Sequence, residues 1–304
     1  MSSYYYNVLE PAVEQQGSHM IMKNVSKTLK DKIVNIDTKY RPSYNYKSPA
    51  SVNMTFGEKL TEVRSIEVVS MDIPYTMFNI TGDNECVSDG NNYLRIKQNG
   101  GVSKMLTITP NDYPTTALLA TEINAQLSAL SLGTDISYSV VNNKSYFKSK
   151  TSSYSMATNV DICGNTNDLN TQNNFGWTLG FRDTSYNLTT AGLYSECLLS
   201  LKTPRHLFLA LNEFSQGNAN SFVSPQENKN QNKNIIAKIS LPSTLVFGDT
   251  LCANKANGLL VSEVRKYLEK VNIHRMHLQL LDDAGRVVKL NGSDFSVCLR
   301  VVHE

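Results

Sequence analysis

The sequence predicts a mainly β protein: an antiparallel β-sandwich, jelly-roll-like, with one or two short helices. Many short segments alternate apolar and polar residues, turn residues separate them, and strands and helices do not alternate regularly. The C-terminal region is the clearest case, because alternation recurs over residues 271–281, 286–290 and 295–302. Gly285 and Gly292 lie between these segments, and glycine readily adopts the positive φ angles of tight hairpins. We therefore expect a three-stranded antiparallel meander there.

Further segments with a period of two predict strands along the rest of the chain. Residues 63–73 form a long one, and its apolar phase slips between Val68 and Val69, as at a β-bulge or a strand buried on both faces. Hairpins are expected around Gly100-Gly101 and Asn142-Asn143. Shorter strands are expected at residues 33–36, 52–56, 177–179, 206–212, 235–241 and 259–264.

One segment has helical periodicity instead. Asp112 or Thr115 can cap this helix, and Pro114 suits its first turn. We expect its apolar face to cover one edge or end of a sheet. The residues of that face are spaced three or four apart: Leu119, Ile123, Leu127 and Leu130.

The chain is predicted to consist of an arm and one domain. Residues 1–30 have little periodicity and are interpreted as an extended N-terminal arm that orders against a partner. Residues 31–304 contain no composition shift that marks a second domain, so we expect a single jelly-roll-like β domain. Within it, residues 149–174 are rich in Ser, Thr, Asn and Asp and predict a long polar excursion. Residues 226–234 predict an exposed loop.

Composition argues against nucleic acid and membranes as partners. The 304 residues carry a formal net charge of +2 and are 18% charged, whereas binding to a phosphate backbone needs many clustered Lys and Arg. The one basic cluster, around Lys23 to Lys32, is interrupted by Asp31 and is interpreted as solvated. No run of about 18 apolar residues occurs. We expect no specific nucleic-acid partner and no transmembrane segment.

The N-terminal sequence and the cysteine pattern indicate the cellular compartment in which the protein is found. Residues 1–16 lack the cationic start and apolar block of a secretory signal. The five cysteines are far apart, and no Cys-x-x-Cys pair occurs. We therefore expect reduced thiols in an intracellular compartment.

The residues whose side chains could take part in chemistry are explained by structural roles instead. His274 and His277 lie three apart on a predicted strand, so they point to opposite faces and do not share a metal. We place His274 on the face of Met276 and Leu278. Asp282-Asp283 occupies the start of a predicted turn, where Asp bonds the local backbone. No phosphate-binding loop or nucleophile motif is present. We expect no catalytic residue, metal or cofactor, and therefore no enzyme.

Aromatic residues beside cationic ones are candidates for contacts with other proteins. They occur in the arm and in a Pro-containing segment near residue 40. Such a mixture could also stack on single-stranded nucleic acid, but in a nearly neutral chain we favour a subunit interface, where Tyr and Arg are enriched. The candidate contact residues are Tyr4, Tyr5, Tyr6, Tyr40, Arg41, Tyr44 and Tyr46.

Five segments in order resemble a known family. They include the strand that ends in Met71-Asp72-Ile73-Pro74 and the run Gly176-Trp177-Thr178-Leu179-Gly180-Phe181-Arg182. From about residue 33 to the C-terminus the chain resembles the minor capsid proteins, penton-like or cement, of large icosahedral DNA viruses and their satellite viruses. The five segments are residues 34–41, 65–80, 107–124, 176–182 and 271–302.

This resemblance implies a virion structural protein with a jelly-roll-like fold and no enzymatic activity. It implies a location in the capsid shell, assembled in the host cell interior, with the major capsid protein and other capsid subunits as partners. It leaves open a place at the fivefold vertices or between the major capsomers, and whether the chain forms a homo-oligomer. One alternative is a receptor- or glycan-binding β-sandwich of a spike or fibre. Another, a hydrolase on a β scaffold, has no support in the sequence.

Overall fold

The structure, a computed structural model, divides the chain into two compact units. It describes residues 7–16, 19–42, 49–82, 90–151, 153–160, 164, 172, 174–202, 204–214, 224–226, 229–231 and 234–304. Unit 1 combines Met1–Thr76 with Pro204–Glu304, and unit 2 is Met77–Thr203. The sequence predicted one domain over residues 31–304. The difference arises because unit 2 is inserted into unit 1 and has the same β-rich composition, so no composition shift marks either boundary.

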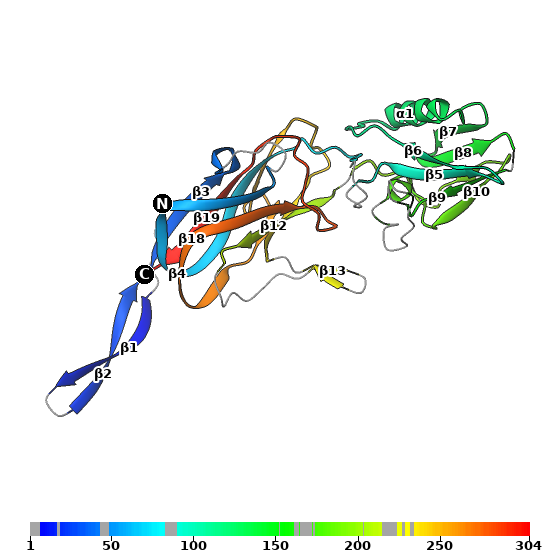
Figure 1. Cartoon of the computed structure of the whole chain (residues 1–304). Coiled ribbons are helices and arrows are strands. Elements are labelled where there is room, and N and C mark those ends of the chain that lie inside the picture. Colours follow the sequence, from blue (N-terminus) through cyan, green and yellow to red (C-terminus); the bar gives the residue numbers. More distant parts are fainter. Residues whose placement is uncertain are drawn as a thin grey trace. The chain divides into compact units, whose positions relative to one another are not determined.

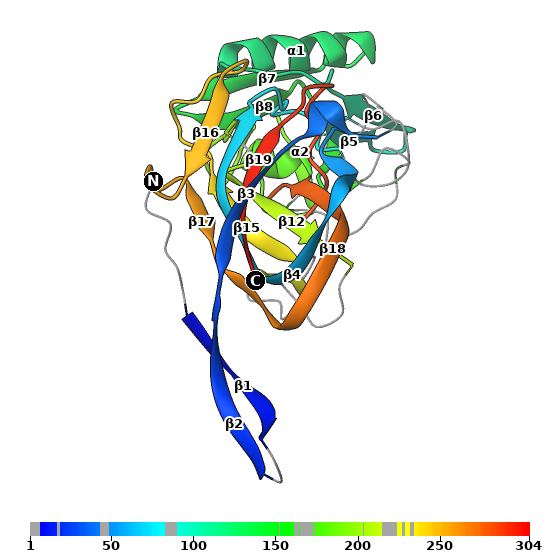
Figure 2. The same cartoon turned by 90° about the vertical axis from the view of Figure 1, so that its left-hand side faces the viewer.

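Unit 1 is built around one curled antiparallel sheet (Figures 1 and 2). Its strands lie in the order β17-β15-β12-β18-β4-β19-β3, and β16 also pairs with β4. Figure 2 shows these strands curving around a common interior. Their bounds are β3 (Lys30–Asp37), β4 (Ser51–Pro74), β12 (His206–Asn212), β15 (Ile235–Ser240), β16 (Thr250–Asn254), β17 (Leu260–Ser262), β18 (Arg265–Leu281) and β19 (Ser296–His303).

Strand β4 is the centre of this sheet. It joins the two strands predicted at residues 52–56 and 63–73 into one strand of 24 residues. Its first part pairs with β18 and its second with β19, while β16 pairs with its last residues. The pairing with β19 passes from Ser70 directly to Val68, so Val69 is an extra residue. The bulge that the apolar phase slip predicted is therefore present at that position.

The curl of the sheet brings its far strand back towards β4. The Val68 backbone N–H donates to Ser262 Oγ of β17 at 3.1 Å. Side chains on the inner face are fully buried, as is expected when a curled sheet encloses its own core. The inner residues include Val63, Ile66, Leu209, Leu211, Ile239, Met276, Leu278, Leu280, Leu299 and Val301. The predicted class, an antiparallel jelly-roll-like β-sandwich with few helices, is confirmed.

The predicted C-terminal meander is only partly correct. Strands β18 and β19 are present, but each pairs with β4. Between them, residues 286–290 make one isolated bridge, between Leu281 and Val287. The periodicity correctly gave the buried face of each strand. It could not give the partner, which lies more than 200 residues away in the sequence.

The predicted N-terminal arm contains a β-hairpin. Strand β1 (Asn7–Gln16) pairs antiparallel with β2 (His19–Thr28), from Asn7 opposite Thr28 to Gln16 opposite His19. Strand β3 begins two residues after β2, at Lys30. Strands β1 and β2 thus fold back on each other as an antiparallel pair.

Unit 2 contains two sheets and one long helix. One sheet has the order β10-β9-β5-β6 and the other β11-β8-β7. Both predicted hairpins are present, and Asn142 and Asn143 have φ angles of 52° and 60°, as a type I′ turn requires. The bounds are β5 (Tyr93–Gln98), β6 (Ser103–Thr107), α1 (Thr116–Ala129), β7 (Ile136–Val141), β8 (Lys144–Ser149), β9 (Tyr154–Ala157), α2 (Phe175–Thr178), β10 (Ser185–Leu188) and β11 (Leu193–Tyr194).

Helix α1 closes the core of unit 2. Thr115 caps it, and the side chain accepts from the Leu118 N–H. The helix lies over β7 in both views (Figures 1 and 2). Leu119, Ile123 and Leu127 are fully buried in one cluster with side chains from both sheets. The predicted helix and its apolar face are confirmed, and Leu130 is only partly buried because it is the C-cap.

The strand predicted at residues 177–179 is wrong. These residues belong to α2, a single helical turn that Asn174 caps by accepting from the Gly176 N–H. Gly180 ends the turn with a φ of 96°. A Cβ there would lie 2.3 Å from the Cys197 carbonyl oxygen, so only glycine fits. Period-two spacing over three residues did not distinguish a strand from one turn of helix.

Two predicted loops contain short strands. The excursion predicted at residues 149–174 includes β9, which pairs with β5 and β10. The loop predicted at residues 226–234 includes β14 (Lys229–Gln231), which pairs with β13 (Ser224–Gln226). Much of both segments lies outside the described residues.

A buried ion pair joins three strands of unit 1. Arg265 donates to Glu213 Oε2 at 2.8 Å, and the two side chains are 2% and 0% exposed. The same guanidinium donates to the carbonyl oxygens of Leu211 and Asn234. Tyr267 Oη donates to Glu213 Oε1 at 2.8 Å. Burial, followed by the negative charge of Glu213, raises the pKa of Tyr267.

Glu213→Ala should destabilise unit 1 strongly, because it leaves the Arg265 cation buried without its counter-charge. We expect a loss of about 3–5 kcal/mol in the free energy of unfolding. Urea unfolding followed by far-UV circular dichroism measures it, and fluorescence of the single Trp177 follows unit 2 separately. Glu58→Ala is the matched control, since that carboxylate is 87% exposed, and should change stability by about 0.5 kcal/mol at most. Equal losses in the two variants would contradict the prediction.

Candidate functional site

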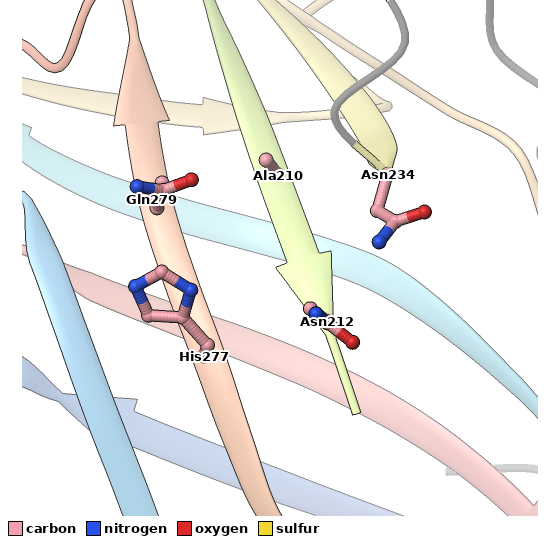
Figure 3. Close-up of a pocket in the computed structure, with 5 residues that line it drawn as sticks. All are labelled: Ala210, Asn212, Asn234, His277 and Gln279. Carbon is pink, nitrogen blue, oxygen red and sulfur yellow. The ribbon is translucent and has the colours of Figure 1, made fainter. Parts of the chain in front are cut away.

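The candidate site is a polar pocket in unit 1. It has a volume of about 220 Å³ and lies where β12, β18 and the residue before β15 meet. Figure 3 shows His277 and Gln279 side by side on β18, Ala210 and Asn212 on β12, and Asn234 across from them. These five residues line the pocket.

Strand alternation places the pocket side chains on the face opposite the core. On β18, Met276, Leu278 and Leu280 are fully buried, so His277 and Gln279 between them face the other way. On β12, Leu209 and Leu211 face the core in the same manner. The strand register sets Ala210 opposite Gln279 and Asn212 opposite His277. The same pattern that builds the core thus groups these polar residues.

The small side chain of Ala210 and an irregular backbone beside it create the hollow of the pocket. Ala210 carries only a methyl group between two longer neighbours, Gln279 on one side and Ile235 on the other. The register of β12 with β15 shifts at Ala210, which leaves one extra residue on β15. Asn234, just before β15, has a φ of 55°, in the left-handed region that Asn tolerates well. Together these features open space above Ala210.

Ser51 holds two of the pocket side chains. Its Oγ lies 3.2 Å from His277 Nε2 and accepts from Gln279 Nε2 at 3.3 Å. Asn212 Oδ1 accepts from the Phe214 backbone N–H at 2.9 Å. Burial lowers the pKa of His277, so the imidazole is neutral at pH 7. The lining therefore offers uncharged donors and acceptors.

The buried ion pair supports one wall of the pocket. Arg265 donates to the carbonyl oxygens of Leu211 and Asn234. Asn234 lines the pocket, and Leu211 lies between the lining residues Ala210 and Asn212. Beyond Asn212, Phe214 has a φ of 56° and a half-exposed ring, with the Arg275 guanidinium 4.5 Å from the ring centroid. A positive φ in a bulky residue is uncommon and concentrates at binding sites.

The histidine pair considered as a metal site is divided between two environments. His277 lines the pocket, whereas His274 is exposed to solvent. Placing His274 on the face of Met276 was wrong, because a register shift between Ile273 and Arg275 turns the strand. Among the described residues, no group of three His, Cys, Asp or Glu side chains is arranged to hold a metal ion.

Asp282, the first residue of the Asp282-Asp283 pair, has the structural role that was predicted. Asp282 Oδ1 accepts from the backbone N–H groups of Ala284 and Arg286 at 3.0 and 2.8 Å. Its Oδ2 pairs with the Arg286 guanidinium at 2.8 Å. This carboxylate therefore organises the turn that follows β18.

The predicted contact residues have different positions. Tyr40 is 75% exposed. Arg41 is buried: it pairs with Asp294 and donates to the Thr38 carbonyl at 2.6 Å. Arg41 thus anchors the short 3-10 helix η1 (Thr38–Tyr40), which carries Tyr40. The remaining five lie outside the described residues: Tyr4, Tyr5, Tyr6, Tyr44 and Tyr46.

Sequence reasoning missed most of the pocket. His277 was considered only as a metal ligand, and Asn212, Asn234 and Gln279 were not singled out. The available signal was polar residues alternating with the Leu and Met of two predicted strands. That signal gave the outer face of each strand, but not that β12 and β18 are neighbours.

The fold defines the protein as a mainly β, antiparallel protein of two units, each with its own buried core. The chain belongs to a family of proteins of unknown function (DUF5901), whose model matches residues 22–249. No curated protein matches the sequence.

Several solved structures are similar to this chain, and two of them are described here. One is the mavirus penton protein, at 12% identity and a TM-score of 0.44, covering 90% of this chain and 99% of that one. The other is a chain of the cryo-EM structure of the Sputnik virophage, at 12% identity and a TM-score of 0.37, covering 90% of this chain and 98% of that one. Within the described ranges, no helix has the length and apolar character needed to cross a membrane.

Stability should fall as the pH is lowered from about 7.5 to 6.0. Burial lowers the folded-state pKa of both His277 and His206 below 6.5, with nearby Lys238 also lowering that of His206. The unfolded chain therefore binds more protons as the pH falls through about 6.5, and this favours unfolding. Urea unfolding across this range measures the loss.

The double variant His206→Gln/His277→Gln should show a smaller loss over the same range. Asn53→Gln, a non-titrating change on β4 opposite His277, is the control and should match the unmodified protein. Stability that is constant or rises on acidification would be inconsistent with both buried imidazoles being neutral.

Proposed function

We propose that this protein is a non-enzymatic structural protein of a virion, a minor capsid subunit. The observation that carries the proposal is the ordered resemblance of five segments to minor capsid proteins. Three of them, residues 34–41, 65–80 and 271–302, contribute to the mutually paired strands β3, β19, β4 and β18. The other two, residues 107–124 and 176–182, supply helix α1 and the turn around α2. The resemblance thus falls on the segments that build both cores.

The surface near η1 supports a role in subunit contacts. Thr38 is fixed by bonds to Phe295 in both directions, since its N–H donates to the Phe295 carbonyl and its Oγ1 accepts from the Phe295 N–H. Arg41 and Asp294 hold the other side of the turn. A rigidly held, exposed Tyr loses little conformational entropy on binding, and Tyr is enriched among residues that dominate interface energetics.

The chemistry that we propose is association and not catalysis. Partners are the major capsid protein and other capsid subunits, and the location is the capsid shell, assembled in the host cell interior. A closed lattice presents many copies of each contact, so interfaces of about 1,000 Å² become collectively stable. The nearly neutral charge, +2 over 304 residues, suits packing among subunits better than packing on nucleic acid.

Two positions in the shell fit this proposal, the fivefold vertex and a place between major capsomers. The mass of the purified protein in solution separates them. A stable pentamer supports the vertex, and a monomer or small oligomer supports the position between capsomers.

The pocket favours a second candidate function, recognition of a glycan. Trp177 is a weaker platform for a sugar than Phe214, because Trp177 is only partly exposed whereas Phe214 is 49% exposed. The neutral polar lining beside Phe214 offers a better site. The two functions are compatible, because the pocket shares no residue with η1.

Tyr40→Ala should weaken incorporation into particles without unfolding the protein. Removal of an interface hot-spot Tyr costs about 2 kcal/mol or more, so we expect at least about a thirtyfold loss of affinity for assembled shells. Co-expression with the major capsid protein, followed by particle purification and quantification of this chain, measures it. Tyr194→Ala removes another exposed Tyr, in unit 2, and is the control. Equal incorporation of both variants would exclude Tyr40 from the contact.

Deletion of residues 1–28 should leave a folded protein that fails to enter particles. Strand β3 begins at Lys30 and Leu29 is buried, so this cut keeps the sheet intact. The removed hairpin pairs with itself among the described strands. Circular dichroism checks folding, and particle purification checks incorporation. Normal incorporation of the shortened chain would eliminate the arm as an assembly element.

A further inference from the structure

We propose that the pocket of unit 1 binds one neutral pyranose ring of a glycan. This inference rests on the second candidate function, recognition of a glycan, and assigns its ligand class to a defined group of residues. The hydrogen-bonding capacity, charge and size of the pocket, and the aromatic ring beside it, point to this ligand.

The lining has hydrogen-bonding atoms that the described part of the chain does not satisfy. Asn212 uses its Oδ1 for the Phe214 N–H, and Gln279 uses its Nε2 for Ser51. The Asn212 amide NH₂, the Gln279 Oε1 and both side-chain polar atoms of Asn234 have no hydrogen-bond partner among the described residues. The lining of the pocket therefore offers both donors and acceptors. A hydroxyl both donates and accepts, so neighbouring hydroxyls of a sugar match this set.

The charge of the lining selects against ions. No Asp, Glu, Lys or Arg lines the pocket. The Arg265 guanidinium behind the wall is occupied by Glu213 and the carbonyl oxygens of Leu211 and Asn234, and the Arg275 guanidinium lies over the Phe214 ring. A phosphate or an acidic sugar would lose hydration with no cation to replace it. A divalent cation would find no carboxylate. Neutral ligands are the remaining class.

The size of the pocket fits one ring. A volume of about 220 Å³ is roughly that of seven liquid waters at about 30 Å³ each. It is below the 300–1,000 Å³ typical of pockets for drug-sized ligands. A single pyranose can enter, and the rest of a glycan would continue outside. A folded peptide segment does not fit.

Phe214 gives the site an apolar surface beside its polar wall. Its backbone N–H is tied to Asn212, which holds the residue next to the pocket. The ring is 49% exposed, with Arg275 against it. The C–H face of a pyranose is apolar and can cover an exposed aromatic ring. Polar groups on one side and an aromatic ring beside them match the two chemical faces of a sugar.

The test uses the full chain and ligand-observed NMR by saturation transfer. The probes are methyl β-D-galactopyranoside, methyl α-D-mannopyranoside and N-acetylglucosamine, with N-acetylneuraminic acid as the charged comparison and triglycine as a peptide probe. We expect at least one neutral sugar to bind with a Kd on the order of 1 mM, and the acidic sugar and the peptide not to compete for it.

Two variants and a control locate the site. Ala210→Leu fills the hollow, and Gln279→Ala removes one amide with little effect on packing; each should weaken binding at least tenfold. Asn187→Ala removes an exposed amide from β10 in unit 2 and should bind as the unmodified protein does. Circular dichroism confirms that each variant is folded.

Three outcomes would overturn the proposal: no transfer to any neutral sugar at tens of millimolar, sugar binding that both pocket variants retain, or binding of triglycine in place of the sugars. Particle incorporation of the same variants separates this proposal from the structural role. Pocket variants that enter particles normally but lose the sugar support both functions.

Discussion

The backbone pairing of β4 is the constraint on which unit 1 depends. This one strand of 24 residues satisfies its backbone hydrogen bonds with β18 on one side and β19 on the other, and with β16 at its end. Because the bulge at Val69 and the positive φ of Glu62 bend it, the sheet can curl until β17 reaches Val68. The core, the buried ion pair and the pocket all follow from this curl.

Core and pocket are two consequences of the same alternation. Residues two apart on β12 and β18 fill the interior with Leu and Met, and the residues between them lie on the opposite face of the sheet. On that face Phe208, Ala210, Ile235 and Leu281 form a second buried cluster. Where an Ala stands opposite Gln279, the outer face becomes hollow. The Arg265–Glu213 pair then fixes the carbonyls of Leu211 and Asn234 beside that hollow. Stability and the geometry of the pocket are thus linked through one ion pair.

The two proposed functions depend on different parts of the structure and on different interactions. Shell assembly relies on a held turn with an exposed Tyr40 and on the repetition of modest contacts in a lattice. Sugar binding relies on unsatisfied amides next to a half-exposed ring. In both cases an ion pair supports the site without facing the ligand: Arg41 with Asp294 at the turn, and Arg265 with Glu213 behind the pocket.

The sequence by itself determined the mainly β class, most strands, helix α1 with its cap, both hairpins of unit 2 and the bulge at Val69. Each depends on spacing or turn chemistry within a few residues, which is local information. Only the tertiary structure decided that β18 and β19 both pair with β4, that unit 2 is inserted in unit 1, and that residues 177–179 form a helical turn. It also decided the pocket, because Ala210, Asn234 and Gln279 meet only through pairing between strands tens of residues apart. Periodicity states which face of a strand is buried, whereas the choice of neighbour depends on the packing of the whole chain.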